Sequence, residues 1–410
     1  MPSTLSSSPS PAAPQKSRGS YIAFLIFIAI LGAFSSLVND MYLPTMPAMR
    51  REFHCSTSMT QMGLTMVMLG LGIGSVIWGS LSDRYGRKPM LLYSLGLFAV
   101  ATLVSIFSDS IYFFIICRLF QGIGAGGGMV LSYSIPTDLY QGRQLAKVMA
   151  LVGAINGIAP AASPIVGGAM ADSVGWRGIF VLLLVIGVGM FFWSIKRPES
   201  LAPDKRIHGK GLKEYLKPYG MLFRNGRFMI YVLIKAIGIG MLYGYISASP
   251  FIIQDRYGYT AGEFGLILGA NAIAIAVGST LVMKFKVLKR GLETGTVIMS
   301  VAAIGLAVIL IMGKGLLWFE LMAVPMLLGS GMLFSSANSL GMQVGRADAG
   351  TASAILNVVK YIFAAVVSPL VGLGDIMRSS GIAFIIIAAV ALGLTLLAIR
   401  LKPLASMVKQ

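Results

Sequence analysis

Of the charged side chains inside stretches of sequence that are otherwise apolar, four are the residues best placed to do chemistry. Asp40 and Arg118 belong to the first half of the chain, and Lys235 and Lys360 belong to the second. A full charge inside an apolar span costs several kcal/mol unless it meets a partner or water, so such residues mark functional positions. A partly desolvated carboxylate can bind a proton on one side of a membrane and release it on the other. Proton binding and release is the chemistry that these residues predict.

The elements that must hold these residues are helices that cross a membrane. The chain has 410 residues, of which 56% are hydrophobic and only 12% are charged. A soluble protein of this length could not bury so much apolar surface, so lipid must cover the remainder. A spanning helix needs about twenty mostly apolar residues. Twelve such runs are expected, at 21–43, 57–79, 90–108, 111–133, 146–170, 176–195, 226–250, 262–283, 293–312, 317–341, 350–373 and 380–401.

The runs predict an all-α membrane protein with twelve transmembrane helices in two six-helix bundles. A polar stretch separates the sixth run from the seventh, and this layout is typical of the parallel repeats of one large class of transporters. The expected organisation is a disordered cytoplasmic tail at 1–20, an N-terminal bundle at 21–195, a cytoplasmic linker at 196–225, a C-terminal bundle at 226–401 and a cytoplasmic tail at 402–410.

The distribution of basic residues predicts the orientation in the membrane. If both termini are cytoplasmic, 24 of the 33 Lys and Arg residues lie in cytoplasmic segments, 6 lie in external loops and three lie within spans. The positive-inside rule therefore places both ends of this multi-pass chain in the cytoplasm. The net charge of +18 comes from these loops, and the segment from Lys196 to Arg227 is expected to lie along anionic lipid. No nucleic-acid partner is predicted.

Residues for enzymatic or metal chemistry are scarce. The two cysteines, Cys55 and Cys117, and the two histidines, His54 and His208, have no metal-ligand spacing. No nucleophile is accompanied by a base at a catalytic spacing. We therefore expect no enzyme activity, no metal ion and no cofactor.

The four charged residues are expected at two depths in the membrane, Asp40 with Arg118 and Lys235 with Lys360. The first span runs outward and reaches Asp40 after about nineteen residues, and the fourth runs inward and reaches Arg118 after about eight. Both lie at similar depth in the outer half, as paired charges should. Alternatively, Asp40 could be a solvated carboxylate at the membrane boundary, and Arg118 could snorkel to the surface.

Lys235 and Lys360 each lie about nine residues from the cytoplasmic start of a helix. Lys235 could snorkel inward, whereas Lys360 is expected to be a cavity or coupling residue.

The loop after the second span combines a carboxylate, three cations and regularly placed glycines. A positive-inside loop would explain its basic residues but not Asp83 or the glycine spacing. The string closely resembles the signature loop of the major facilitator superfamily, where an acid and basic residues form a charge network that latches the two halves at the cytoplasmic side. The resemblance implies that Asp83 is the latch acid, with Arg84 and Arg87 as its partners. The expected gating loop is Gly79, Asp83, Arg84, Gly86, Arg87 and Lys88.

Two further strings resemble motifs of the same superfamily. Arg118, followed by Gln121 and closely spaced glycines, is similar to the helix 4 motif, in which the arginine takes part in proton coupling. The fifth span resembles the motif of the antiporter branch but has Ala159 and Ser163 where glycines are usual. If the chain is not an antiporter, the prolines would still bend this span and the glycines would still let neighbouring helices pack against it. Its expected motif residues are Pro160, Pro164, Gly167 and Gly168.

A more specific resemblance begins at the end of the first span. The string 39–44 (Asn-Asp-Met-Tyr-Leu-Pro) is similar to drug:proton antiporters of the bicyclomycin and chloramphenicol resistance type, as are the strings 245–252 and 350–354. Some related exporters carry a second acid where this chain has Gly32. The resemblance implies a monomer in a bacterial inner membrane that exports small amphipathic compounds, including drugs, in exchange for protons. The expected proton-coupling residues are Asp40, Arg118 and Lys360, and the expected substrate-binding residues are Asn39, Asp40, Gln121, Asn156, Tyr245, Asn271 and Asn338.

Two other functions are compatible with these features. A proton-linked exporter of a specific metabolite, such as a sugar or a peptide-like solute, would share the fold and most of the motifs. A transporter-like sensor would usually carry a sizeable soluble domain, but the longest loop here has only about thirty residues. The polar residues within spans could also serve as hydrogen bonds between helices. In either transporter, the expected partners are a small-molecule substrate, protons and the lipid bilayer.

Overall fold

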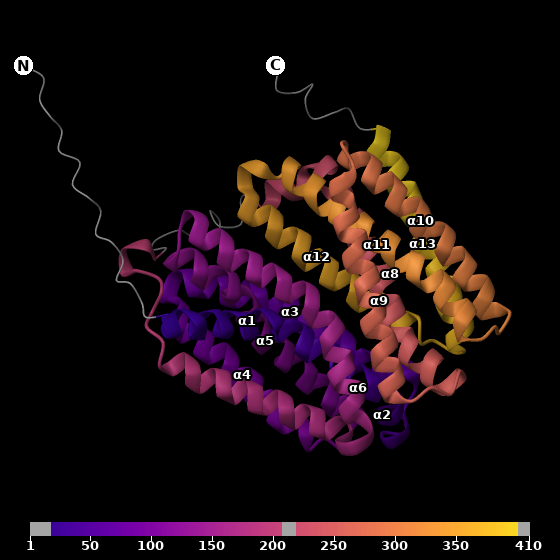
Figure 1. The fold of residues 1–410 in the computed structure, drawn as a ribbon, viewed down its shortest axis with the longest axis horizontal. Helices are drawn as coiled ribbons and strands as arrows, with labels where there is room; N and C mark the ends of the chain where they lie inside the picture. Colours follow the sequence, from indigo (N-terminus) through magenta and orange to yellow (C-terminus); the bar gives the residue numbers. More distant parts are fainter. Residues whose placement is uncertain (1–17, 207–218, 401–410) are drawn as a thin grey trace, which may run out of the picture.

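The computed structural model describes residues 18–206 and 219–400, and every regular element in these ranges is helical (Figure 1). The expected tails at 1–20 and 402–410 and the linker at 196–225 lie wholly or partly outside these residues. The first half contains α1 (Arg18–Asp40), the short α2 (Met46–Glu52), α3 (Thr57–Tyr85), α4 (Arg87–Ile106), α5 (Ile111–Leu139) and α6 (Gly142–Ile195). The second half contains α8 (Gly226–Pro250), α9 (Ala261–Leu281), α10 (Leu288–Ile311), α11 (Leu316–Val344), α12 (Ala349–Leu370) and α13 (Ile376–Arg400).

The longest helix, α6, accounts for two of the expected spans. It has 54 residues but is interrupted at Gly175, whose φ of 63° and ψ of −171° are not helical. Glycine adopts this conformation without steric cost, so the chain can change direction there. In the described part of the chain, eleven helices are long and apolar enough to cross a membrane, and the break in α6 makes twelve spans. The prediction of a twelve-helix fold is confirmed.

Local sequence signals fix where several helices begin. Ser56 accepts a hydrogen bond from the backbone N–H of Met59 at 3.2 Å and so caps α3. At the start of α9, the Thr260 hydroxyl accepts from the N–H of Glu263 at 3.2 Å, and the Glu263 carboxylate accepts from the N–H of Thr260 at 2.8 Å. This reciprocal capping box satisfies two backbone donors that a helix start would otherwise leave unpaired.

The bundles are held together by close helix contacts that only small residues permit. In the first bundle, α3 and α5 cross where a side-chain carbon on Gly122 would lie 3.0 Å from the Cα of Gly70. In the second, α10 and α11 cross where one on Gly329 would lie 2.8 Å from the carbonyl oxygen of Gly295. Small residues drive helix association in lipid because they let the backbones approach and pack.

The two bundles lie side by side, with α6 of the first against α9 of the second (Figure 1). We call the end that carries the α3–α4 loop the inner end, and the end that carries α2 the outer end. Side chains donate hydrogen bonds to backbone carbonyls of the opposite bundle: Ser58 to Pro369 (3.0 Å), Gln61 to Ser247 (2.9 Å), Thr65 to Ala365 (3.1 Å) and Gln254 to Pro44 (3.0 Å).

These hydrogen bonds lie in the outer half of the helices, and further contacts close the outer end. Asp255 forms ion pairs with Arg50 at 3.1 Å and with Arg51 at 3.0 Å. Beside them, α6 and α9 touch at Gly168 and Gly265, where added side-chain carbons would meet the backbone of the facing helix. The bundles are therefore joined at their outer ends by backbone contacts between α6 and α9 and by the ion pairs of Asp255. We call these contacts the outer seam.

The seam predicts that Gly168→Ala is destabilising. A methyl group there would lie 2.6 Å from the carbonyl oxygen of Ala261, so α9 must move. We expect the free energy of unfolding to fall by about 1–3 kcal/mol, as for other overpacked sites. The matched control is Gly153→Ala in the same helix, where a methyl group meets nothing within 4 Å. The control should be neutral or stabilising by up to about 1 kcal/mol. Detergent-induced unfolding of the purified proteins measures both, and equal midpoints would contradict the prediction.

Candidate functional site

Arg118 is completely buried in α5, and its guanidinium connects three helices. Its Nη2 donates to the backbone carbonyl of Val38 in α1 at 3.0 Å, and its Nε donates to that of Gly63 in α3 at 3.4 Å. Its Nη1 donates to the side-chain oxygen of Gln121, and the charge lies 4.3 Å from the ring centre of Tyr42. Arg118 does not extend to the membrane surface, so the snorkelling alternative is wrong.

Asp40 is buried at the last residue of α1, with 7% of its surface exposed. The side-chain amide of Asn39 donates to Asp40 Oδ1 at 2.7 Å, and Arg118 is close enough to interact electrostatically. Within the described residues, however, no cation lies within ion-pair distance of the carboxylate. Asp40 and Arg118 therefore lie at similar depth, as expected for paired charges, and interact electrostatically without a direct ion pair. Arg118 uses the carbonyl of Val38 as its acceptor in α1, two residues before Asp40.

The antiporter-type string of α6 packs directly against this end of α1. Pro160 and Pro164 lie inside the helix, where each lacks a backbone donor. At Gly167, the carbonyl of Met41 occupies the place of a side chain, so only glycine allows this contact. The string therefore helps to position the residue that follows Asp40, whatever further function it has.

Three tyrosines, contributed by both bundles, form a series of neighbouring residues that begins beside Asp40. Tyr243 of α8 is near enough to Asp40 and to Tyr361 of α12 for electrostatic interaction. Tyr361 in turn interacts with Tyr133 of α5, whose hydroxyl accepts a hydrogen bond from Asn156 at 2.7 Å. Asn156, expected to bind substrate, thus belongs to a polar and aromatic region shared by the two bundles.

The two lysines of the second bundle lie close together. Lys235 is buried, with 5% of its surface exposed. Its Nζ donates to Oδ1 of Asn338 at 2.8 Å and to Oδ1 of Asn357 at 3.4 Å. The alternative in which Lys235 snorkels is therefore wrong, because the side chain is held inside the bundle. Lys360 is half-buried, with its Nζ 4.6 Å from the ring centre of Tyr361.

A carboxylate that sequence reasoning missed joins two of the expected substrate-binding residues. The amide of Asn271 donates to the hydroxyl of Tyr245 at 2.6 Å and to Glu320 Oε2 at 2.8 Å. Glu320 also accepts from Tyr245 at 3.4 Å. Its position inside the expected span 317–341 was the signal that could have identified it. Tyr245 and Asn271 thus form, with Glu320, a hydrogen-bonded group within the second bundle.

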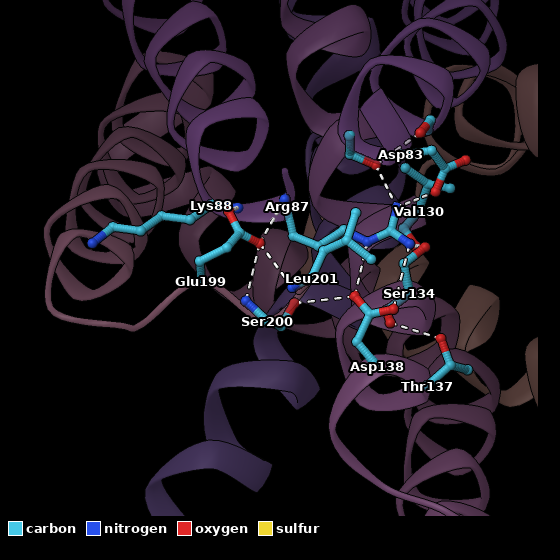
Figure 2. Close-up of polar contacts among 12 residues, drawn as sticks. Asp83, Arg87, Lys88, Val130, Ser134, Thr137, Asp138, Glu199, Ser200 and Leu201 are labelled. Atoms are coloured by element: carbon cyan, nitrogen blue, oxygen red, sulfur yellow. Dashed lines mark hydrogen bonds and ion pairs between the residues drawn. The ribbon is translucent and has the colours of Figure 1, made fainter. Parts of the chain in front are cut away.

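At the inner end, Arg87 is the centre of a charge network (Figure 2). Its Nε donates to Asp138 of α5 at 2.9 Å, and its Nη1 donates to Ser82 at 2.8 Å and to Asp83. The expected contact between Asp83 and Arg84 is absent from the described residues, since Arg84 lies over the ring of its neighbour Tyr85. Arg87 is directed inward at the start of α4, whereas Arg84 ends α3 on an exposed face.

Glu199, after α6, completes the network by capping α4. Its carboxylate accepts from the backbone N–H groups of Arg87 at 2.8 Å and Lys88 at 3.1 Å (Figure 2). A negative charge is favourable at a helix start because of the helix dipole. Gly86 makes this possible, since its φ is 106° and a side-chain carbon there would lie 2.5 Å from Glu199. Sequence reasoning missed both Asp138, in the last turn of α5, and Glu199, which follows the end of α6. Gly79 lies within α3, below the loop.

The match to known proteins agrees with this architecture. Residues 28–369 match the family described as the Major Facilitator Superfamily. The chain belongs to this superfamily. It is 32% identical to the uncharacterized MFS-type transporter YdgK of Bacillus subtilis, over 86% of this chain and 89% of that protein. It is 27% identical to the bicyclomycin resistance protein homolog of Haemophilus influenzae, over 84% and 88%.

Solved structures of the superfamily share the fold. A bacterial homolog of the human lysosomal transporter Spinster superposes with a TM-score of 0.75 and 17% identity, over 94% of this chain and 98% of that one. The xylose transporter XylE of E. coli gives a TM-score of 0.70 and 14% identity, over 93% and 99%. The protein is therefore a multi-pass membrane transporter of the major facilitator fold.

The inner-end network predicts different effects for two arginines of one loop. Arg87→Leu leaves Asp83 and Asp138 without their shared partner, and we expect the free energy of unfolding to fall by about 3 kcal/mol. The control, Arg84→Leu, removes an exposed side chain whose guanidinium lies over Tyr85, and it should change the free energy of unfolding by no more than about 0.5 kcal/mol. Unfolding in mixed micelles measures the difference, and equal losses would contradict it.

The geometry around Arg118 predicts that lysine cannot replace it. A single ammonium cannot reach the carbonyls of Val38 and Gly63 and the amide of Gln121 in the geometry of a planar guanidinium. We expect Arg118→Lys to lower the free energy of unfolding by about 2–4 kcal/mol, because buried acceptors lose their donors. The exposed Arg378→Lys is the matched control and should be neutral. A thermal melt of Arg118→Lys that matches the wild type would rule out this role.

Proposed function

We propose that the protein exports small amphipathic compounds, including drugs, in exchange for protons by alternating access. The observation that carries the proposal is the buried Asp40 carboxylate, which faces the second bundle and has a neutral amide as its hydrogen-bond donor. A carboxylate so placed can change its protonation state with the exposure of the site. Relatives named for resistance to bicyclomycin and chloramphenicol support drugs as the substrates.

In the proposed cycle, Asp40 takes up a proton when the outer ends of the bundles are apart and releases it when the inner ends are apart. Arg118 acts as a positioning residue, because it fixes the end of α1 and provides a positive charge that favours release. Substrate binds between the bundles near Asn39, Asn156 and the tyrosines. The contacts at the outer ends correspond, in this cycle, to the state in which protons and substrate exchange with the inner side.

The orientation follows from the charges of the loops. We propose that the inner end faces the cytoplasm of a bacterium, that both termini lie there, and that the protein works as a monomer. The basic inner loops support this orientation through the positive-inside rule. The network of Asp83, Arg87 and Asp138 would then stiffen the cytoplasmic end of the first bundle while the second bundle moves against it.

The test is proton-driven transport by an Asp40→Asn variant. In everted vesicles with an acidic lumen, the wild type should accumulate radiolabelled chloramphenicol. The variant cannot exchange a proton at residue 40, so we expect its gradient-driven uptake to fall at least about tenfold, a barrier change of about 1.4 kcal/mol. Exchange of labelled for unlabelled compound without a gradient should persist.

The control for this experiment is Asp109→Asn, which removes a carboxylate that is 97% exposed in an external loop. It should transport like the wild type. Undiminished gradient-driven uptake by Asp40→Asn would overturn the role of Asp40, and a wild type that ignores the gradient would overturn proton exchange itself.

A further inference from the structure

Two lysines of the second bundle, Lys235 and Lys360, lie inside helices that span the membrane. Lys235 is the tenth residue of α8 and Lys360 the twelfth of α12, so each lies roughly 14–17 Å from the inner start of its helix. Lys235 donates a hydrogen bond at 3.4 Å to Asn357, which lies three residues before Lys360 on the same face of α12, so the two ammonium groups are neighbours and repel each other. Within the described residues, neither forms an ion pair. Two like charges at this depth are costly unless a ligand or water compensates them.

The groups around the lysines offer hydrogen-bond donors rather than negative charge. The oxygens of Asn338 and Asn357 accept from Lys235, which directs the amide nitrogen of Asn338 away from the ammonium. Lys360 forms no hydrogen bond or ion pair within the described residues, and its Nζ lies 4.6 Å from the ring centre of Tyr361. The cluster of Lys235, Lys360, Asn338 and Asn357, which we call the lysine cluster, is thus suited to a ligand that brings acceptor oxygens.

The lysine cluster borders the surface between the bundles. Tyr361, next to Lys360, donates its hydroxyl to the sulfur of Met129 in α5 at 3.4 Å. Its side chain also lies against α3, where the ring atom Cδ2 is 3.6 Å from the position of a side-chain carbon on Gly72. Lys360 is therefore within reach of a substrate held between the bundles, and the tyrosines beside it offer aromatic faces.

We propose that the lysine cluster binds the negatively charged group of an amphipathic organic anion, such as a carboxylate or a sulfonate. The anionic group accepts hydrogen bonds from Lys235 and Lys360 and removes their repulsion, and the apolar part of the molecule packs against Tyr361, Tyr243 and Tyr133. This assigns Lys360, expected among the coupling residues, to substrate recognition. The inference names the substrate class of the proposed transporter and so rests on the proposed function.

The experiment measures binding instead of transport, so that it does not depend on proton exchange. Purified protein in nanodiscs is titrated with fluorescein, an organic anion, and with ethidium, an organic cation, and fluorescence anisotropy gives the dissociation constants. The wild type should bind fluorescein more tightly than ethidium. Lys360→Met and Lys235→Met should each weaken fluorescein binding about tenfold or more, which is about 1.4 kcal/mol, and leave ethidium binding equal or tighter.

Further variants separate recognition from folding. Lys360→Arg keeps the charge and should retain fluorescein binding within about threefold, whereas a purely structural lysine would show no such rescue. Lys284→Met removes an exposed lysine of the same bundle and should have no effect. Because Lys360 is half-buried, its Met variant is the one expected to fold if Lys235→Met does not.

Three outcomes would overturn the inference. The wild type does not bind fluorescein, Lys360→Met loses affinity for fluorescein and ethidium equally, or Lys360→Met binds fluorescein as tightly as the wild type. Each of these leaves the proposed function intact if gradient-driven uptake still depends on Asp40. Conversely, a wild type whose transport ignores the proton gradient but whose fluorescein binding still depends on the lysines would overturn only the proposed function.

Discussion

The burial of the Arg118 guanidinium is the constraint around which the first bundle is arranged. A charge without access to water needs acceptors in fixed places, and here they are backbone carbonyls of α1 and α3 and the amide of Gln121. These bonds fix the end of α1 and with it the position of Asp40. Because the carboxylate is not one of the acceptors, Asp40 can gain or lose a proton while the three helices stay connected.

The two ends of the molecule are stabilised in different ways. At the outer end, glycines of α6 and α9 bring backbones of opposite bundles into contact, and Asp255 pairs with two arginines of α2. At the inner end, Arg87 connects α3, α4 and α5 within one bundle, with Glu199 as the cap of α4. The outer seam must separate for alternating access, whereas the inner network can move as part of a rigid bundle.

Titratable groups of opposite charge, Asp40 from the first bundle and Lys360 from the second, interact with the same group of tyrosines. Lys235 also belongs to the second bundle, and the tyrosines 133, 243 and 361 lie between Asp40 and the lysines. A substrate anion at the lysines and a proton at Asp40 would therefore occupy different bundles. Transport would then depend on how the two sites change their distance and exposure as the bundles move, rather than on competition for a single group.

The sequence by itself determined the twelve spans, the superfamily and the depth of the four membrane charges. These properties depend on local hydropathy and on the fixed rise of a helix, which do not require knowledge of partners. Only the tertiary structure decided which groups meet. Arg84 and Arg87 carry the same charge in one loop, yet only Arg87 faces Asp138, 51 residues away. Packing likewise decides that Lys235 donates to Asn357 and that Asn271 donates to Glu320. It also decides that Arg118 donates to the backbone carbonyl of Val38 and not to Asp40. Partner choice depends on which helix faces come together, and helices distant in sequence set that when they pack.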